Sequence, residues 1–177
     1  MSIDFSSCTE EELWKYVGSH LAKNGFDAVL VGGAVVSIYS KGAYRSGDLD
    51  FVIQNMFKTD LVEVMKDIGF IKHGRHYIHP ECKHLFVEYP PGPLGVGEDT
   101  SITPDIHSAY GVEIKILSPT DCIKDRLASY IHFKSQEGLD EAILVAKSQQ
   151  YSVSKVEEWC KKENAEWAFK DFTKKLM

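Results

Sequence analysis

The sequence lacks several features that would place the protein in a special class. No apolar run reaches the ~18 residues that a membrane-spanning helix needs, so no membrane partner is expected. Residues 1–12 are polar and acidic and lack the basic and apolar regions of a secretory signal, so we expect a cytoplasmic protein. The four cysteines are widely spaced and form no Cys-x-x-Cys pair, which predicts free thiols.

Basic residues are also scarce relative to acidic ones. The chain has 20 Lys and Arg against 26 Asp and Glu, which gives a net charge of −6 at pH 7. Such a balance argues against broad, non-specific binding to nucleic acid. The rest of the composition, with 44% hydrophobic and 11% aromatic residues, is typical of a globular chain that buries a sizeable core.

The order of apolar runs and turn residues predicts a mixed α/β chain. Thr9 and Glu12 form a capping-box pattern at the start of a helix. Strands are predicted at 26–31, 48–54, 85–89 and 112–117, a loop at 95–107, and late helices at 118–133, 139–149 and 154–175. We therefore expect an α/β (α+β) fold, a mixed β-sheet flanked by helices, with a core at 1–117 and a helical region at 118–177 packed on it.

Residues 29–53 carry the clearest chemical pattern, a strand, a Gly-Gly turn, a short helix, a loop and a strand that begins with Asp-Leu-Asp. Gly32 and Gly33 allow backbone amides to approach a phosphate closely, and the following helix start offers free N–H groups. Asp48 and Asp50, two positions apart on a strand, point to the same side. Paired carboxylates favour a hard cation such as Mg²⁺ or Mn²⁺.

Simpler interpretations of these residues stay open. A Gly-Gly pair is also typical of a plain tight turn, and Asp48 and Asp50 also fit a solvated strand entry. The dinucleotide-binding pattern Gly-x-Gly-x-x-Gly is absent. A separate group is rich in possible zinc ligands, but its spacing fits no zinc template, and a hairpin with exposed histidines is favoured. This group consists of His73, His76, His79, Cys82 and His84.

The pattern Val31-Gly32-Gly33 followed by Asp48-Leu49-Asp50-Phe51 resembles the nucleotidyltransferase superfamily, which has a polymerase-β-like fold. The later segments FVEYPPGPLGVG and IKILSPTDCIKDRLASYIHF resemble small bacterial and archaeal nucleotidyltransferase-like proteins related to the transferase toxins of abortive-infection systems. The resemblance covers about residues 26–133. One departure is that Ala34 follows Gly33, so the glycine motif has no Ser and lacks one side-chain contact to phosphate.

The resemblance implies an enzyme that moves a nucleoside monophosphate from an NTP to an acceptor and releases pyrophosphate. It implies that the catalytic and metal-binding residues are Asp48, Asp50 and Glu88, with Mg²⁺ or Mn²⁺ as cofactor. It also implies that the nucleotide is bound by Gly32, Gly33, Lys41 and Arg45. Further basic candidates near the site are Lys115, Lys124 and Arg126.

The sequence leaves the acceptor open between RNA, a protein and a small molecule. It also leaves open a non-catalytic alternative, a nucleotide-binding or protein-interaction module of the same fold. Such a module would suit a toxin–antitoxin component with an antitoxin-like protein partner. The carboxylates argue for the enzyme, because buried acids without a cation cost stability.

Overall fold

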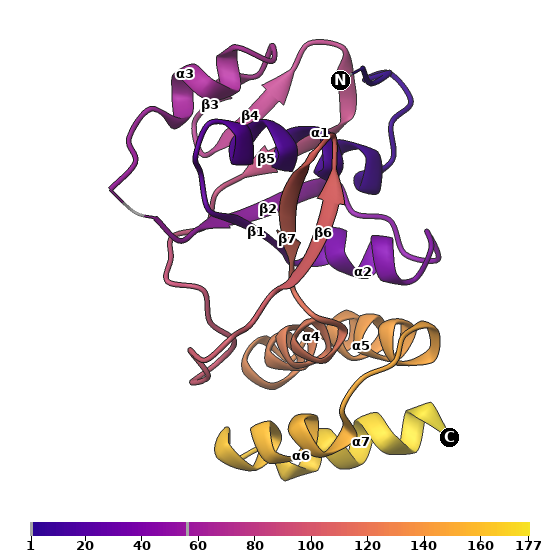
Figure 1. Cartoon of the computed structure of the whole chain (residues 1–177). Helices are drawn as coiled ribbons and strands as arrows, with labels where there is room; N and C mark the ends of the chain where they lie inside the picture. The colour runs from indigo at the N-terminus through magenta and orange to yellow at the C-terminus, as the bar shows by residue number, and fades with distance from the viewer. Residues whose placement is uncertain (1, 56) are drawn as a thin grey trace.

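The computed structural model describes residues 2–55 and 57–177, and it contains a mixed sheet with helices packed beside and below it (Figure 1). The strands are β1 (Ala28–Val31), β2 (Asp48–Ile53), β3 (Ile71–His73), β4 (His76–His79), β5 (Cys82–Glu88), β6 (Asp105–Ala109) and β7 (Val112–Ile116). The helices are α1 (Glu10–Lys23), α2 (Gly33–Tyr39), α3 (Leu61–Lys66), α4 (Pro119–Phe133), α5 (Gln136–Ser148), α6 (Val153–Lys162) and α7 (Glu166–Leu176). This arrangement confirms the predicted fold class.

The sheet has seven strands in the order β3-β4-β5-β2-β1-β7-β6. β2 lies at its centre, antiparallel to β1 and parallel to β5. β1 also pairs in parallel with β7. The strand direction therefore reverses between β2 and β1. The register pairs Asp50 with Val31 on one side and with Glu88 on the other. The sheet therefore brings the ends of three separate segments to one place.

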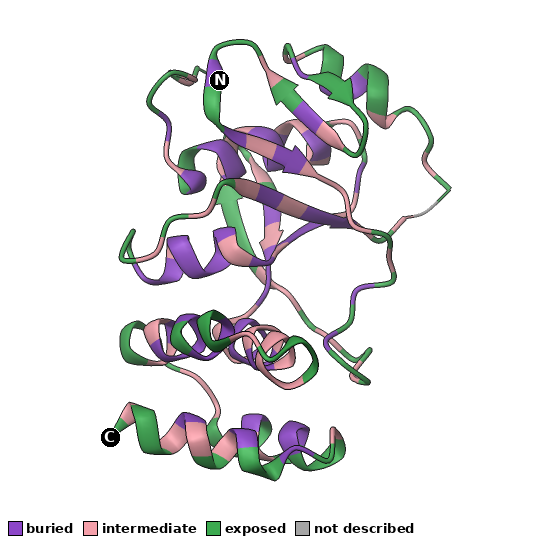
Figure 2. Cartoon of the chain, turned by 180° about the vertical axis from the view of Figure 1, so that it is seen from behind, coloured by how far each residue is buried: buried purple, intermediate pink, exposed green. Residues whose placement is uncertain are grey.

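Alternation along β2 explains how two acids come to sit in a central strand. Leu49 and Phe51 are fully buried, whereas Asp48 and Asp50 are half-buried on the opposite face. Helices α1 and α2 contact each other and the central strands, and the buried residues of α1 and α2 face the sheet (Figure 2). The apolar side of β2 is thus anchored, and its acidic side stays available.

The start of α1 has the predicted capping box. The backbone N–H of Thr9 donates to Glu12 Oε2 at 2.8 Å, and Thr9 Oγ1 accepts from the Glu12 N–H at 3.2 Å. Such reciprocal bonds satisfy amides that have no partner within the helix. The first helix therefore begins where the sequence predicts.

The helices after β7 form two successive layers below the sheet (Figure 1). α4 packs against α5, and α6 and α7 contact this pair from the far side. One hydrophobic cluster runs from the sheet through α4 and α5 to Phe172 in α7. The division of the chain at residue 117 into two domains stays a prediction. None of the helices in the described residues is long and apolar enough to span a membrane.

Two predicted segments are wrong. The expected loop at 95–107 contains the start of β6, an edge strand that pairs antiparallel with β7. Its central residues are exposed, so the strand carries no alternating apolar pattern that a sequence could reveal. The expected helix at 154–175 is two helices, because Asn164 adopts a left-handed conformation (φ 55°) between α6 and α7. The prediction of free cysteines is confirmed for all four.

Candidate active site

Three carboxylates from two neighbouring strands meet at the centre of the sheet. Asp48 and Asp50 come from β2, and Glu88 ends β5 directly opposite Asp50. Oxygen atoms of all three lie within 4.8 Å of one another, and each side chain is half-buried. The structure therefore brings together the acids that the sequence suggested in two separate segments.

The electrostatics of this cluster favour a cation. Burial and the charges of Asp48 and Glu88 raise the pKa of Asp50 to about 7, although the nearby Arg126 acts in the opposite direction. Among the ion pairs of the described residues, His76 with Glu88 is the only one that includes a member of the trio. A divalent ion would neutralise this excess charge, and an all-oxygen ligand set suits Mg²⁺ or Mn²⁺.

The glycine turn passes directly beside the carboxylates. Gly32 has a φ of +75°, which disfavours any other residue, and a Cβ at this position would lie 2.7 Å from Asp50 Oδ2. Gly33 then starts α2. The site therefore requires glycine at position 32 for two reasons: the turn needs a positive φ there, and the backbone passes close to Asp50.

Ser46 is a site residue that the sequence analysis missed. Its Oγ lies 2.9 Å from Asp48 Oδ1 and 3.0 Å from the Asp48 carbonyl oxygen, and the hydroxyl is a donor to both. A Cβ added to Gly33 would lie 3.1 Å from the same Oγ. Ser46 thus places a hydroxyl next to the position where a serine in the glycine motif would begin.

Ser46 is itself held by a buried acid of α1. Its backbone N–H donates to Glu10 Oε1 at 2.9 Å, and Glu10 is only 2% exposed. The other Glu10 oxygen lies 3.5 Å from Arg45 Nη1. The sequence gives no sign that Glu10 holds Ser46, because an acid in the first turn of a helix is expected for the helix dipole alone. The position of Ser46 two residues before Asp48 is the only signal that could have suggested Ser46.

A cleft of about 300 Å³ opens beside Asp50 and Gly32, and Asp125 and Arg126 of α4 also line it. Arg126 is fixed by Asp125 at 2.5 Å and by Glu141 at 3.0 Å. Together these two acids hold its pKa above the usual value, although burial acts to lower it. Arg126 therefore stays protonated, and its charge is paired with Asp125, which lines the same cleft, and with Glu141.

A second depression, of about 450 Å³, lies next to the first cleft. Glu88 and Tyr77 line it, together with Lys72 and Arg75. It shares residues 90 and 91 with the first cleft. One carboxylate of the trio thus lines each hollow, Asp50 the first and Glu88 the second.

The structure does not bring all predicted basic residues to this cleft. Lys41 and Arg45 line a separate depression of about 270 Å³ between α1 and the end of α2. Lys115, on β7, pairs with Asp27 at 2.8 Å and does not line this cleft. Of the basic candidates, Arg126 is the one that lines the cleft with Asp50.

Comparison with known proteins supports the fold. No protein-family model and no curated protein sequence matches the chain. Its structure is similar to that of an antigenic nucleotidyltransferase-like protein from Paracoccidioides brasiliensis, with a TM-score of 0.57, 19% identity, and coverage of 81% of this chain and 76% of that one. The chain has a nucleotidyltransferase-like fold.

The antibiotic-resistance factor ANT(2'')-Ia shares this nucleotidyltransferase-like fold over nearly its whole length. Its solution structure gives a TM-score of 0.54 at 11% identity, with 91% of this chain and 94% of that one covered. The crystal structure of ANT(2'')-Ia in complex with adenylyl-2''-tobramycin gives 0.51 at 10% identity, with 91% and 95% covered. At these identities the likeness shows the fold and leaves the chemistry to be argued from the residues.

The histidines that the sequence analysis assigned to a hairpin lie on β3, β4 and β5, which pair antiparallel in that order. His76 contacts Glu88 from the neighbouring strand. His79 stacks on Phe5, with 3.7 Å between ring centroids. His84 instead lies beside two cysteines, one of which precedes α1. The five residues therefore do not form one site.

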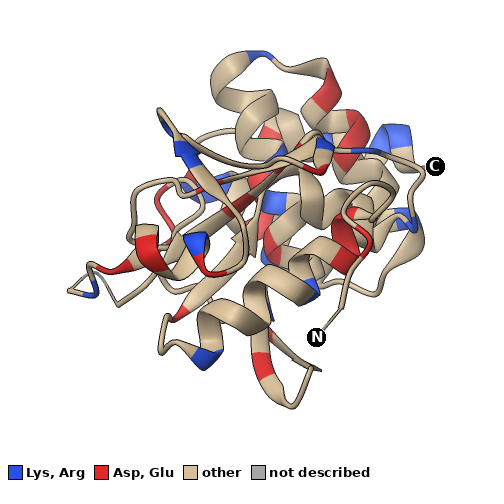
Figure 3. Ribbon diagram, turned by 90° about the horizontal axis from the view of Figure 1, so that it is seen from above, with Lys and Arg blue, Asp and Glu red and all other residues tan. Residues whose placement is uncertain are grey.

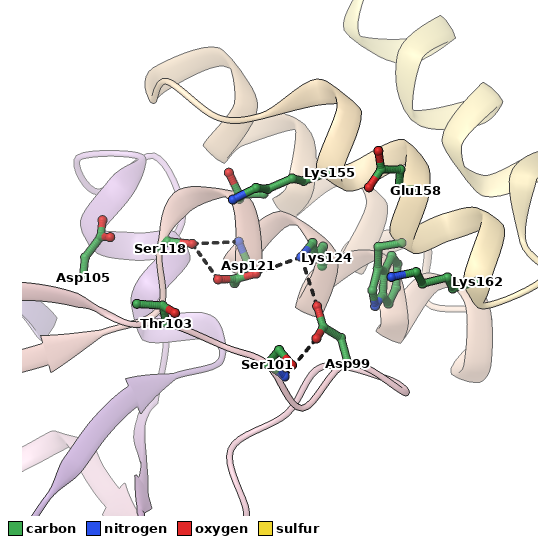
Figure 4. Close-up of a pocket in the computed structure, with 12 residues that line it drawn as sticks. Asp99, Ser101, Thr103, Asp105, Ser118, Asp121, Lys124, Lys155, Glu158 and Lys162 are labelled. Atoms are coloured by element: carbon green, nitrogen blue, oxygen red, sulfur yellow. Dashed lines mark hydrogen bonds and ion pairs between the residues drawn. The ribbon is translucent and has the colours of Figure 1, made fainter.

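A larger hollow, of about 500 Å³, lies away from the carboxylates between α4, α6 and residues 99–105 (Figure 4). Its buried cation, Lys124, is paired with Asp121 at 3.0 Å and with Asp99 at 3.3 Å. None of the three clustered carboxylates lines this hollow. Figure 4 shows Lys124 joined to both Asp121 and Asp99, so these ion pairs hold the loop against α4.

Proposed function

We propose that the protein is a metal-dependent nucleotidyltransferase that transfers a nucleoside monophosphate from an NTP to an acceptor hydroxyl. The observation that carries the proposal is the convergence of Asp48, Asp50 and Glu88 beside the Gly32 turn. The fold supports it, since the solved structures that resemble this chain include ANT(2'')-Ia with an adenylylated product. The excess negative charge of the cluster is what a divalent cation would relieve.

The cleft beside Gly32 suits the triphosphate. Backbone at a glycine with no Cβ can approach phosphate oxygens closely, and Arg126, which lines the same cleft, carries guanidinium N–H donors that suit phosphate. Lys41 and Arg45 stay predicted nucleotide contacts, since they line a different depression. In this proposal, the glycine turn and Arg126 therefore make the main contacts with the triphosphate.

Two of the three carboxylates have a neighbour that would fix their orientation toward a metal. Ser46 orients Asp48 through the 2.9 Å hydrogen bond, and His76 lies against Glu88 on the adjacent strand. Asp48, Asp50 and Glu88 would hold Mg²⁺ or Mn²⁺, which would neutralise the triphosphate and lower the pKa of the attacking hydroxyl. Second partners of this kind fix ligand orientation at metal sites.

The acceptor would enter from the second depression, which Glu88 lines. Its oxygen attacks the α-phosphorus, the bond from that phosphorus to the bridging oxygen breaks, and pyrophosphate leaves with the electron pair. We favour a small-molecule acceptor, because the depression is only about 450 Å³ and because acidic and basic residues are interspersed over the molecule (Figure 3). A long nucleic acid would need a continuous basic track.

The test is transfer of label from α-labelled NTPs in the presence of Mg²⁺ or Mn²⁺. All four NTPs are offered with hydroxyl-bearing small molecules, pooled RNA and cell extract. The Asp48→Asn/Asp50→Asn protein is the inactive control, and Asp67→Asn, at an exposed acid at the end of α3, is the matched charge control. We expect label in a small product with the unmodified protein and Asp67→Asn, and none with the double variant.

Two results would contradict the proposal. Label transfer that survives in the folded double variant would exclude these carboxylates as the catalytic group. Absence of label together with absence of metal-dependent NTP binding by calorimetry would instead favour the non-catalytic module.

A further inference from the structure

A second cluster of possible metal ligands consists of Cys8, Cys82 and His84. Its donor atoms are sulfur and nitrogen, whereas those of the carboxylates are oxygen. Cys8 lies in the segment before α1, Cys82 begins β5, and His84 follows two residues later on the same side of that strand. One ligand atom from each lies within 4.8 Å of the other two. The fold thus joins residues that are 74 positions apart in the sequence.

The distance between the sulfurs matches a shared metal ion. Two thiolates that each lie about 2.3 Å from a tetrahedral zinc are separated by about 3.8 Å. Cys8 Sγ and Cys82 Sγ lie 4.0 Å apart, and both side chains are buried. A disulfide would require about 2.05 Å, roughly half the observed distance.

The hydrogen bond of His84 fixes the tautomer of its ring. Nε2 lies 2.7 Å from the carbonyl oxygen of Cys8. Because a carbonyl oxygen only accepts, Nε2 carries the proton, and Nδ1 of the neutral ring keeps a free lone pair. Metal-binding histidines commonly donate their other ring N–H to a backbone carbonyl in this way. Here the carbonyl belongs to another member of the cluster.

We propose that Cys8, Cys82 and His84 bind one Zn²⁺ ion, with a water molecule at the fourth position. Two thiolates and one imidazole are typical zinc ligands and poor ligands for Mg²⁺, so this site and the carboxylates select different metals. Binding displaces the two thiol protons, and the resulting Zn²⁺–dithiolate unit is neutral, which suits its buried position.

Zinc at this position would tie the segment before α1 to β5. β5 also ends in Glu88, so the ion would hold the strand that supplies one of the three carboxylates. The inference goes beyond the proposed transfer activity and does not depend on it. Removal of the ion would release the residues before α1.

The experiment measures zinc in the full-length protein. The chain is expressed in zinc-supplemented medium with a reductant, desalted, and analysed for metal by mass spectrometry. We expect about one Zn²⁺ per chain, and a large loss of zinc in Cys8→Ser, Cys82→Ser and His84→Gln. His84→Gln is the safest of these for folding, because the side chain is exposed. Cys160→Ser, at a buried free thiol on α6, is the matched control and should keep its zinc.

Cobalt distinguishes this site from the carboxylates. Co²⁺ bound to Cys8 and Cys82 gives a thiolate-to-metal charge-transfer absorption, which carboxylates cannot produce. The Asp48→Asn/Asp50→Asn protein should keep both the zinc and this absorption, whereas His84→Gln should require at least tenfold more Co²⁺ to reach it.

Three results would overturn the proposal. The first is a zinc content of the unmodified protein no higher than that of Cys82→Ser. The second is cobalt binding without the thiolate absorption. The third is a titration in denaturant, without reductant, that finds only two of the four thiols, since this would make the pair a disulfide. A chelator should also lower the melting temperature of the unmodified protein, and it should leave that of folded His84→Gln unchanged.

Discussion

The hydroxyl of Ser46 lies so close to Gly33 that it can in principle be moved there. A Cβ at position 33 would lie 3.1 Å from Ser46 Oγ and 3.3 Å from Tyr44 Oη. Gly33 does not need a positive φ, so its backbone accepts a side chain. We predict that Gly33→Ser rescues the loss caused by Ser46→Ala, because both positions deliver a hydroxyl to Asp48 and to the phosphate side of the turn.

The magnitudes follow from the contacts. Ser46→Ala removes a 2.9 Å hydrogen bond to a carboxylate, a bond of a type that contributes about 1.5–3 kcal/mol. If it acts in the transition state, kcat/KM falls by about 10- to 100-fold. Gly33→Ser alone crowds Ser46 and costs about 1–3 kcal/mol through overpacking. In the double variant, Ser46→Ala removes the crowded atom, so we expect a coupling of about 1–2 kcal/mol in favour of activity.

The assay is a double-mutant cycle on kcat/KM with saturating Mg²⁺, supported by melting temperatures for all four proteins. The matched control is Gly33→Ala/Ser46→Ala, which has nearly the same bulk and no hydroxyl. It should show no rescue, while Gly33→Ser/Ser46→Ala should have a higher kcat/KM than both Ser46→Ala and this control. Additive losses in the cycle, or equal activity of the two double variants, would refute the idea that the hydroxyl at this place matters.

Other changes at the site test its separate parts. Asp50→Asn should abolish transfer yet stabilise the metal-free protein at pH 8 by about 2 kcal/mol, discounted for solvent exposure, because the raised pKa of Asp50 means that its ionised form opposes folding above the ordinary carboxyl pKa. Thermal melting should show Mg²⁺ stabilising the unmodified protein and not this variant. Gly32→Ala should cost about 1–3 kcal/mol in urea unfolding, since its φ is +75°, and should abolish metal binding by calorimetry because its Cβ meets Asp50. Arg126→Lys keeps the charge but loses the fork that Asp125 and Glu141 hold, so steady-state kinetics should show KM for the NTP rising about tenfold with kcat nearly unchanged.

Local patterns predicted the parts of the fold whose cause is local. The alternation in β2 set Asp48 and Asp50 against Leu49 and Phe51, and the structure shows that alternation directly. The capping box of α1 likewise needs only Thr9 and Glu12. In both cases the residues that determine the structure lie close together in the chain, so the sequence alone contains the information.

The parts that the sequence missed depend on distant contacts. β6 is a strand because β7 lies beside it, and its own exposed residues carry no period. Ser46 and Glu10 are 36 positions apart and meet only because α1 packs beside the loop that leads into β2. A sequence pattern does not record such a long-range contact, so the closeness of the Ser46 hydroxyl to Gly33 is seen only in the structure.

The segment around the start of α1 supports both strands that carry the carboxylates. Glu10 fixes Ser46, and Ser46 holds Asp48 at the head of β2. Cys8, two residues earlier, lies against Cys82 at the head of β5, the strand that ends in Glu88. A cluster of like charges would tend to separate its strands, since each carboxylate raises the cost of ionising the next. Contacts that tie both strands to one short segment oppose this separation, and they explain why a buried acid is tolerated in the first turn of α1.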